Sequence, residues 1–316
     1  MALQKQKRMK KIHQETNNIH TPVLLNEVLK YLDPHLGNSY LDLTAGYGGH
    51  AEKIIGMARS SIVTLVDRDL EAITYLGEKF KNKNYEIVHS DFLAASINLQ
   101  KANRKYDLIL ADLGVSSLHL NETNRGFSFL SESKLDMRMD QTQKLTADYI
   151  VNKYNQHQLA QLIKKFGEDP KSQRIARLIV ENRPIKSTLQ LAQIIKKAWP
   201  GYTKANPATK TFQAIRILVN DELGQLEASL PIWGNLLNPG GRLAVICFHS
   251  LEDRVVKNYF KKNSSTNYDS TMNLLTKNPV IAGKTEIAIN PRARSAKLRA
   301  VAKIKIKKGG AYAYTG

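Results

Sequence analysis

The stretch Leu41-Asp-Leu-Thr-Ala-Gly-Tyr-Gly-Gly-His50 joins an apolar, strand-like run to a glycine turn and the start of a helix. Glycines in such a turn let the main chain approach a ligand closely, and the free N–H groups of the new helix can face that ligand. A tight turn without a ligand has the same pattern, and a nicotinamide cofactor would use a related loop. The turn therefore predicts a strand-turn-helix unit and leaves its ligand open.

Apolar runs alternate with helical patterns around this turn, which is typical of a parallel sheet covered by helices. We predict strands at residues 40–44, 62–66, 85–88, 106–111 and 242–248. A helix over residues 22–31 precedes the first strand, with Thr21 as its N-cap and Pro22 in its first turn, where a missing N–H costs nothing.

The alternation stops from roughly Gly114 to Thr211, and three helices are predicted in this interval. Asn155 caps the first, which ends at Gly167; the second runs from Asp169 and Pro170 to Asn182, and the third from Ser187 or Thr188 to before Pro200. We therefore expect an inserted helical domain within an α/β core. The predicted parts are core residues 1–113 with a basic tail at 1–19, the inserted domain at 114–211, and core residues 212–316.

Acidic residues accompany the first four predicted strands. Asp67 ends the second strand, where a carboxylate can accept hydrogen bonds from a ribose diol, as nicotinamide and adenosylmethionine sites both require. Asp91 follows the third strand and could accept from an adenine amine, while the ring of Phe92 packs on the purine. Asp42 could meet the cationic amino group of a methionine moiety, and Asp112 ends the fourth strand. Together these positions favour S-adenosylmethionine over a nicotinamide cofactor.

The formal net charge of +19 favours a polyanionic partner. Basic side chains concentrate in two segments without acidic residues, five in residues 1–11 and eight in residues 291–308. A solubilising tail would explain the first segment equally well. Residues 301–306 alternate in polarity, which predicts a strand with one face buried and a row of lysines outward.

The composition favours a cytoplasmic protein that makes no membrane contact. The longest apolar runs are far shorter than the roughly 20 residues of a membrane-spanning helix, and the basic N-terminus lacks a secretory cleavage site. The single cysteine, Cys247, cannot form an internal disulfide and lies in an apolar run, where we expect it to be a small buried hydrophobic residue.

Long ordered strings extend along nearly the whole chain: His20-Thr-Pro-Val-Leu-Leu-Asn-Glu27, Gly48-Gly49-His50, Asp112-Leu-Gly-Val-Ser-Ser117, Arg125-Gly-Phe-Ser-Phe129, Leu135-Asp-Met-Arg-Met-Asp140, Pro207-Ala-Thr-Lys-Thr-Phe-Gln-Ala-Ile-Arg-Ile217, Phe248-His-Ser-Leu-Glu-Asp-Arg254 and Asn290-Pro-Arg-Ala-Arg-Ser-Ala-Lys-Leu-Arg299. With these strings the chain resembles the bacterial ribosomal RNA small-subunit methyltransferase H family. The resemblance implies a class I, Rossmann-like methyltransferase fold with an inserted helical subdomain. It also implies methylation of the exocyclic N4 amine of a decoding-site cytosine in 16S ribosomal RNA, with S-adenosyl-L-methionine as donor.

The resemblance further implies a set of cofactor-binding residues: Gly48, Gly49, His50, Asp67, Phe92 and Asp112. At His119 the family usually has glutamine, so a histidine is expected to make that polar contact. The family also tends to have serine at Cys247 and Asp-Gly-Pro in place of Glu132-Ser-Lys134. The implied partner is the small-subunit ribosomal RNA or the assembled small subunit; the choice between them, and dimer formation, stay open.

Methyl transfer from a sulfonium needs mainly positioning, together with acceptors for the N–H groups of the amine. Asp112, or a neighbouring carbonyl, is the first candidate acceptor, although the resemblance also assigns Asp112 to the cofactor. His249 is the second candidate, as a proton acceptor or relay, and its alternative role is a helix-entry residue packed with Ser250 and Glu252. No group of His, Cys and acidic residues has metal-ligand spacing, so no metal is expected.

Three alternatives remain open. A nicotinamide-dependent oxidoreductase would explain the glycine turn but not the basic ends, and a non-catalytic RNA-binding module would leave the acidic positions without a role. A DNA amino methyltransferase would have a Pro-Pro pair where this chain has Leu113-Gly114.

Five arginines lie in segments that follow strand ends or adjoin the insertion, and they could line a rim that contacts RNA: Arg125, Arg138, Arg254, Arg292 and Arg294. The alternative is ion pairing with nearby acidic residues, which would explain Arg138 and Arg254 at least as well. The acidic residues concerned are Asp136, Asp140, Glu252 and Asp253.

Overall fold

The computed structural model describes residues 22–114, 125–203, 206–264 and 270–304. The chain divides into two compact units, a core formed by the segments up to Gly114 and from Gln225 onward, and an inserted unit at Val115–Gly224. Among the described residues, no helix has the length and apolar character needed to cross a membrane.

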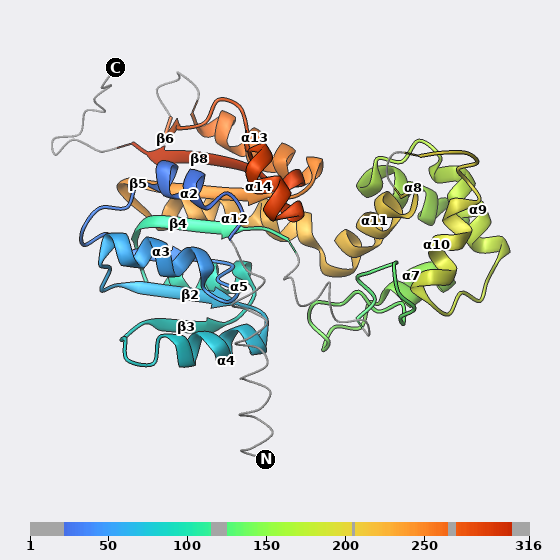
Figure 1. Ribbon diagram of the computed structural model, residues 1–316, viewed down its shortest axis with the longest axis horizontal. Helices are drawn as coiled ribbons and strands as arrows, with labels where there is room; N and C mark the ends of the chain where they lie inside the picture. The colour runs from blue at the N-terminus through green and yellow to red at the C-terminus, as the bar shows by residue number, and fades with distance from the viewer. Residues whose placement is uncertain (1–21, 115–124, 204–205, 265–269, 305–316) are drawn as a thin grey trace, which may run out of the picture. The chain divides into compact units, whose positions relative to one another are not determined.

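The core contains one eight-stranded sheet in the order β3-β2-β1-β4-β5-β8-β6, with β7 paired to β8 (Figure 1). Its strands are β1 Tyr40–Asp42, β2 Val63–Asp67, β3 Glu86–His89, β4 Tyr106–Asp112, β5 Leu237–Cys247, β6 Met272–Leu274, β7 Val280–Ile281 and β8 Lys297–Lys303. The first five strands in this order are parallel, whereas β8 is antiparallel to its neighbours. This arrangement confirms the predicted Rossmann-like class.

Helices cover both faces of this sheet (Figure 1). They are α2 Leu25–Leu32, α3 Gly49–Ala58, α4 Leu70–Lys79, α5 Phe92–Lys101, α12 Glu222–Leu236, α13 Ser250–Asn263 and α14 Lys284–Ile289. Neighbouring residues of β4 point to opposite faces: Leu110 joins the apolar cluster with Val28 of α2, and Ala111 joins the one with Trp233 of α12. Both faces of the parallel strands are therefore buried.

Two predicted elements of the core differ from the structure. The first helix begins at Leu25, because Leu24 has a left-handed conformation with φ of 55°, and the expected cap Thr21 lies outside the described residues. The strand predicted at residues 301–306 is present as β8 up to Lys303, but Val301, on the face expected to point outward with the lysines, is fully buried. Strand β8 lies between β5 and β6, so Leu298 to Val301 are all buried.

The inserted unit is helical, with α7 Ala147–Lys153, α8 Gln156–Gly167, α9 Ser172–Glu181, α10 Thr188–Lys196 and α11 Ala208–Asn220. Asn155 caps α8 in a reciprocal capping box with Gln158, and Ser187 caps α10, as the sequence predicted. Residues of α11 and α8 share one apolar cluster. The unit therefore extends to Gly224, beyond the boundary expected at residue 211.

Candidate active site

Three carboxylates meet at one edge of the sheet because parallel strands end side by side. Asp42, Asp67 and Asp112 are the last residues of β1, β2 and β4, and Asp42 is in register with Leu110 two residues before the end of β4. The Oγ1 of Thr44 accepts a 2.6 Å hydrogen bond from the Asp112 N–H, which links the ends of β1 and β4. In open α/β sheets this carboxyl edge is where ligands bind.

The glycine turn after β1 adopts a conformation that side chains rarely allow. Gly46 and Gly48 have φ of 52° and 72°. A Cβ atom on Gly49 would lie 2.7 Å from the Cγ of Pro22. Gly48 precedes α3 and offers no side-chain cap, so the main-chain N–H groups of this helix end can face an incoming ligand.

The carboxylates of Asp42 and Asp67 each accept one hydrogen bond from the turn and one from a residue outside it. Asp42 accepts from the Tyr40 hydroxyl at 2.6 Å and from the Thr44 N–H at 3.2 Å, yet burial raises its pKa to about 7. Asp67 accepts from the Gly46 N–H at 2.7 Å and from the Asp69 N–H at 2.8 Å. Burial raises the pKa of Asp67 as well.

Asp112 has a buried oxygen, Oδ1, with no hydrogen-bond partner among the described residues. Burial, together with the charges of Asp42 and Glu252, raises the pKa of Asp112 to about 8. An unpartnered buried carboxyl oxygen is costly, so a donor that reaches Oδ1 would be bound favourably.

His50 lies beside Asp112 and cannot neutralise it. The Nε2 of His50 lies 2.9 Å from the Val23 carbonyl, which only accepts, so Nε2 holds the proton and Nδ1 is bare. Nδ1 lies 3.8 Å from Asp112 Oδ2, and burial lowers the pKa of His50 to about 4. The edge thus holds three acidic groups next to a neutral imidazole, which suits a cationic ligand.

Phe92 begins α5 and is held from behind by Trp233. The two rings meet edge to face with centroids 5.7 Å apart, and Trp233 Nε1 donates to Ser96 Oγ at 2.9 Å. Asp91 caps α5 by accepting from the Ala94 N–H, so one of its oxygens already has a partner. Sequence reasoning missed Trp233, which lies in an ordinary apolar helix pattern about 140 residues later in the chain.

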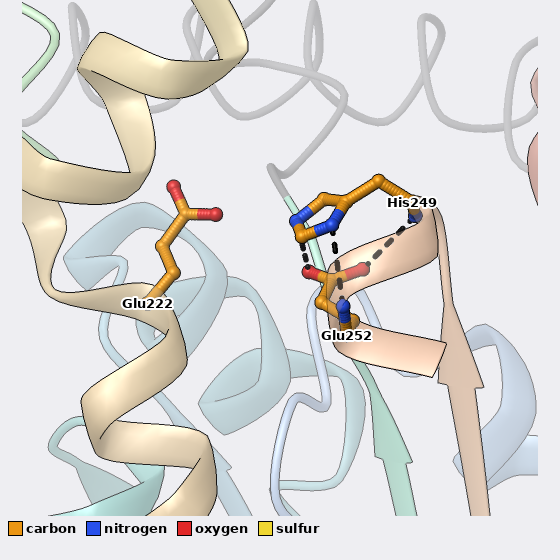
Figure 2. Close-up of side chains that lie close together, drawn as sticks. All are labelled: Glu222, His249 and Glu252. Carbon is orange, nitrogen blue, oxygen red and sulfur yellow. Dashed lines mark hydrogen bonds and ion pairs between the residues drawn. The ribbon is translucent and has the colours of Figure 1, made fainter. Parts of the chain in front are cut away.

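His249 is the N-cap of α13, as Figure 2 shows. Its Nδ1 accepts from the Glu252 N–H at 3.3 Å, and Glu252 Oε2 accepts from the His249 N–H at 3.2 Å. Its Nε2 lies 3.2 Å from Glu252 Oε1, within ion-pair distance, but has no hydrogen-bond partner among the described residues. The structure thus shows the helix-entry role. Glu222, also drawn in Figure 2, belongs to the inserted unit and forms a bidentate pair with Arg216.

Two of the five arginines that were predicted to line an RNA-binding rim form their polar contacts within the inserted unit. Arg138 Nε lies 2.7 Å from Asp136 Oδ1 and Arg138 Nη2 lies 2.9 Å from Asp136 Oδ2. Arg125 Nη2 donates to the carbonyls of Arg138 and Met139 at 2.9 and 3.2 Å. These contacts favour a structural role for both. The expected cofactor residue His119 lies outside the described residues.

Residues 17–304 match the MraW methylase family. The chain belongs to this family. It is 43% identical over 299 residues to the ribosomal RNA small subunit methyltransferase H of Synechocystis sp., covering 90% of this chain and 93% of that protein. The corresponding enzyme of Caldicellulosiruptor saccharolyticus is 44% identical over 305 residues, covering 90% and 99%. An rRNA methylase structure from Streptococcus thermophilus has a TM-score of 0.38 and 10% identity, covering 89% of this chain and 94% of that one.

Membership of the MraW methylase family confirms the resemblance and makes the chain a methyltransferase. The nicotinamide-dependent oxidoreductase and the non-catalytic RNA-binding module are therefore excluded.

Proposed function

We propose that this enzyme transfers the methyl group of S-adenosyl-L-methionine to the exocyclic N4 amine of a decoding-site cytosine in 16S ribosomal RNA. The observation that supports this best is the buried Oδ1 of Asp112 at the carboxyl edge of the sheet, which has no hydrogen-bond partner among the described residues. The names of its relatives point to the small-subunit RNA. Such a substrate places the enzyme in the cytoplasm.

The residues at the edge fit a cationic nucleoside donor, which supplies a methyl group already activated on its sulfonium. Burial raises the pKa of Asp42, Asp67 and Asp112, and a bound cation would favour their ionised forms. In our assignment Asp67 accepts from the ribose hydroxyls, and the Gly48-Gly49 turn faces the methionine moiety. Phe92 would pack on the adenine.

Asp112 would hold the cytosine amine. The amine is a poor nucleophile because its lone pair is delocalised into the ring. An acceptor for one of its N–H groups turns the nitrogen lone pair toward the donor, and the unpartnered Oδ1 can provide this. Asp112 Oδ1 thereby acts on the substrate, while its charge still favours the cationic cofactor, so both candidate roles are compatible.

Two candidate groups could take the proton that the methylated amine releases. Asp112 is in contact with the amine in this scheme, and its carboxylate, whose ionised form the bound cation favours, is a competent acceptor. The Nδ1 of His249 already accepts from the Glu252 N–H. A relay through His249 would have to break that cap, so we assign the proton to Asp112.

Mass mapping of the nucleosides of 16S RNA, from cells with and without this gene, tests the proposal directly. We expect loss of a methyl group from one decoding-site cytosine, and its return with wild-type enzyme but not with Asp112→Asn. Labelled donor with either naked RNA or purified small subunits then identifies the substrate form. An unchanged decoding-site cytosine in the deletion strain would refute the proposal.

A further inference from the structure

Three of the five basic side chains that the structure describes in the C-terminal segment contact other parts of the core. Arg299 Nε lies 2.6 Å from Asp253 Oδ1, and Lys297 Nζ lies 3.7 Å from Asp253 Oδ2. Lys303 Nζ donates to the carbonyls of Gly234 and Leu237 at 2.8 and 2.9 Å. The expectation of outward-facing lysines is therefore wrong for Lys303, and residues 305, 307 and 308 lie outside the described part of the chain.

Arg292 differs from these residues. It lies in the short 3₁₀ helix Pro291–Ser295, which Asn290 caps and which Ala293 anchors with a buried methyl group. The Arg292 side chain is partly buried, and burial lowers its pKa. No carboxylate within the described residues forms an ion pair with it. Its neighbour Arg294 is exposed.

The 3₁₀ helix lies at the same sheet edge as the carboxylates. It is followed directly by β8, whose first residue Lys297 is in register with Cys247, the last residue of β5. The preceding helix α14 reaches the turn before α2, because Glu286 Oε1 accepts from the Leu24 N–H at 2.7 Å. The residue before Leu24 supplies the carbonyl that holds His50 beside Asp112.

A partly dehydrated guanidinium without an acidic partner favours an anionic ligand, because a charge removed from water needs a compensating charge. The planar fork of arginine binds phosphate oxygens in a bidentate manner. An RNA base that enters a buried methyl-transfer site must leave its stack, and contacts with the flanking backbone offset that cost. A backbone phosphate beside the target nucleotide is anionic, offers two oxygens to the guanidinium, and lies next to the base that leaves its stack.

We propose that Arg292 binds an RNA phosphate next to the target cytosine, at the rim of the methyl-transfer site. This inference rests on the proposed function for the identity of the RNA. The methionine carboxylate of a bound cofactor would be a second anion at this edge, so a test has to measure RNA and cofactor binding separately.

The test compares Arg292→Ala and Arg292→Lys with Arg294→Ala, a matched control in the same turn. A single-stranded decoding-site RNA fragment is titrated by fluorescence anisotropy at several salt concentrations, and S-adenosylhomocysteine by calorimetry. We expect Arg292→Ala to weaken RNA binding about tenfold and to lower the salt slope by about 0.7, the value for one single-strand phosphate contact. Arg292→Lys should keep the slope, and Arg294→Ala should change RNA affinity less than twofold.

Three results would overturn the assignment: unchanged RNA affinity in Arg292→Ala, an equal loss in Arg294→Ala, or weaker S-adenosylhomocysteine binding in Arg292→Ala. If Arg292→Ala does not fold, Arg292→Gln replaces it. The RNA measurements do not depend on catalysis. Wild-type enzyme that binds RNA through Arg292 but leaves the decoding-site cytosine unmethylated would therefore refute the proposed function and not this contact.

Discussion

Replacing Asp112 with asparagine should make the core more stable at alkaline pH. Burial raises the pKa of Asp112 from 3.8 to about 8, so between these values the folded protein binds a proton that the unfolded chain has lost. Stability therefore falls as the pH rises through this window, with a limiting slope of about 1.4 kcal/mol per pH unit for one group. An asparagine has no proton to lose, and this part of the slope disappears.

The full window of about four pH units would correspond to roughly 6 kcal/mol, which is an upper limit. A quarter of the Asp112 side chain is exposed, and part of the shift comes from the charge of Asp42. Solvent screening and this coupling reduce the effect. We therefore expect Asp112→Asn to exceed the wild type by about 2 kcal/mol at pH 8, with a difference that shrinks toward pH 5 and closes only below the unfolded pKa of 3.8.

Urea unfolding at pH 5, 6, 7 and 8 measures this difference. The chain has two tryptophans, and Trp233 is fully buried in the core unit, so a Trp199→Phe background makes its fluorescence report on the core. Asp107→Asn is a control that should keep the wild-type pH profile in this range, because hydrogen bonds from Ser39 and Asn238 hold the pKa of Asp107 below its usual value despite burial, and Asp107 is therefore ionised in both the folded and the unfolded state. Parallel pH profiles for Asp112→Asn and the wild type would refute the reasoning.

Three further predictions concern the site. Asp67→Ala should weaken S-adenosylmethionine binding at least about tenfold, through the loss of charged hydrogen bonds to the ribose; calorimetry showing unchanged affinity would contradict the assignment. His249→Asn should keep methylation within about threefold of wild type, because asparagine is an equally good N-cap; a fall of about 10²-fold or more in kcat would identify His249 as a proton relay. Trp233→Phe removes the bond to Ser96 behind Phe92, and should raise the KM for S-adenosylmethionine several-fold while kcat is retained; an unchanged KM would show that Phe92 needs no such support.

The sequence predicted those parts of the fold that depend on neighbouring residues. The glycine turn, the strands and the caps of α8 and α10 follow from local patterns, and the common edge of Asp42, Asp67 and Asp112 follows from parallel pairing. Contacts between distant segments were not predictable in this way. The packing of Trp233 on Phe92 depends on how α12 meets α5, and no local period encodes it.

The number of basic residues in a segment also depends on distant contacts for its meaning. The count does not distinguish a side chain that is paired within the protein from one that is available to a ligand. Arg292 and Arg299 belong to one basic string, and nothing in their immediate neighbours separates them. The difference arises because β8 pairs with β5, which brings Arg299 against Asp253 of α13. Arg292 precedes that strand and has no acidic partner in the part of the chain that the structure describes. The charge that this segment can offer to RNA is therefore set by the pairing of β8, and it is smaller than the sequence suggests.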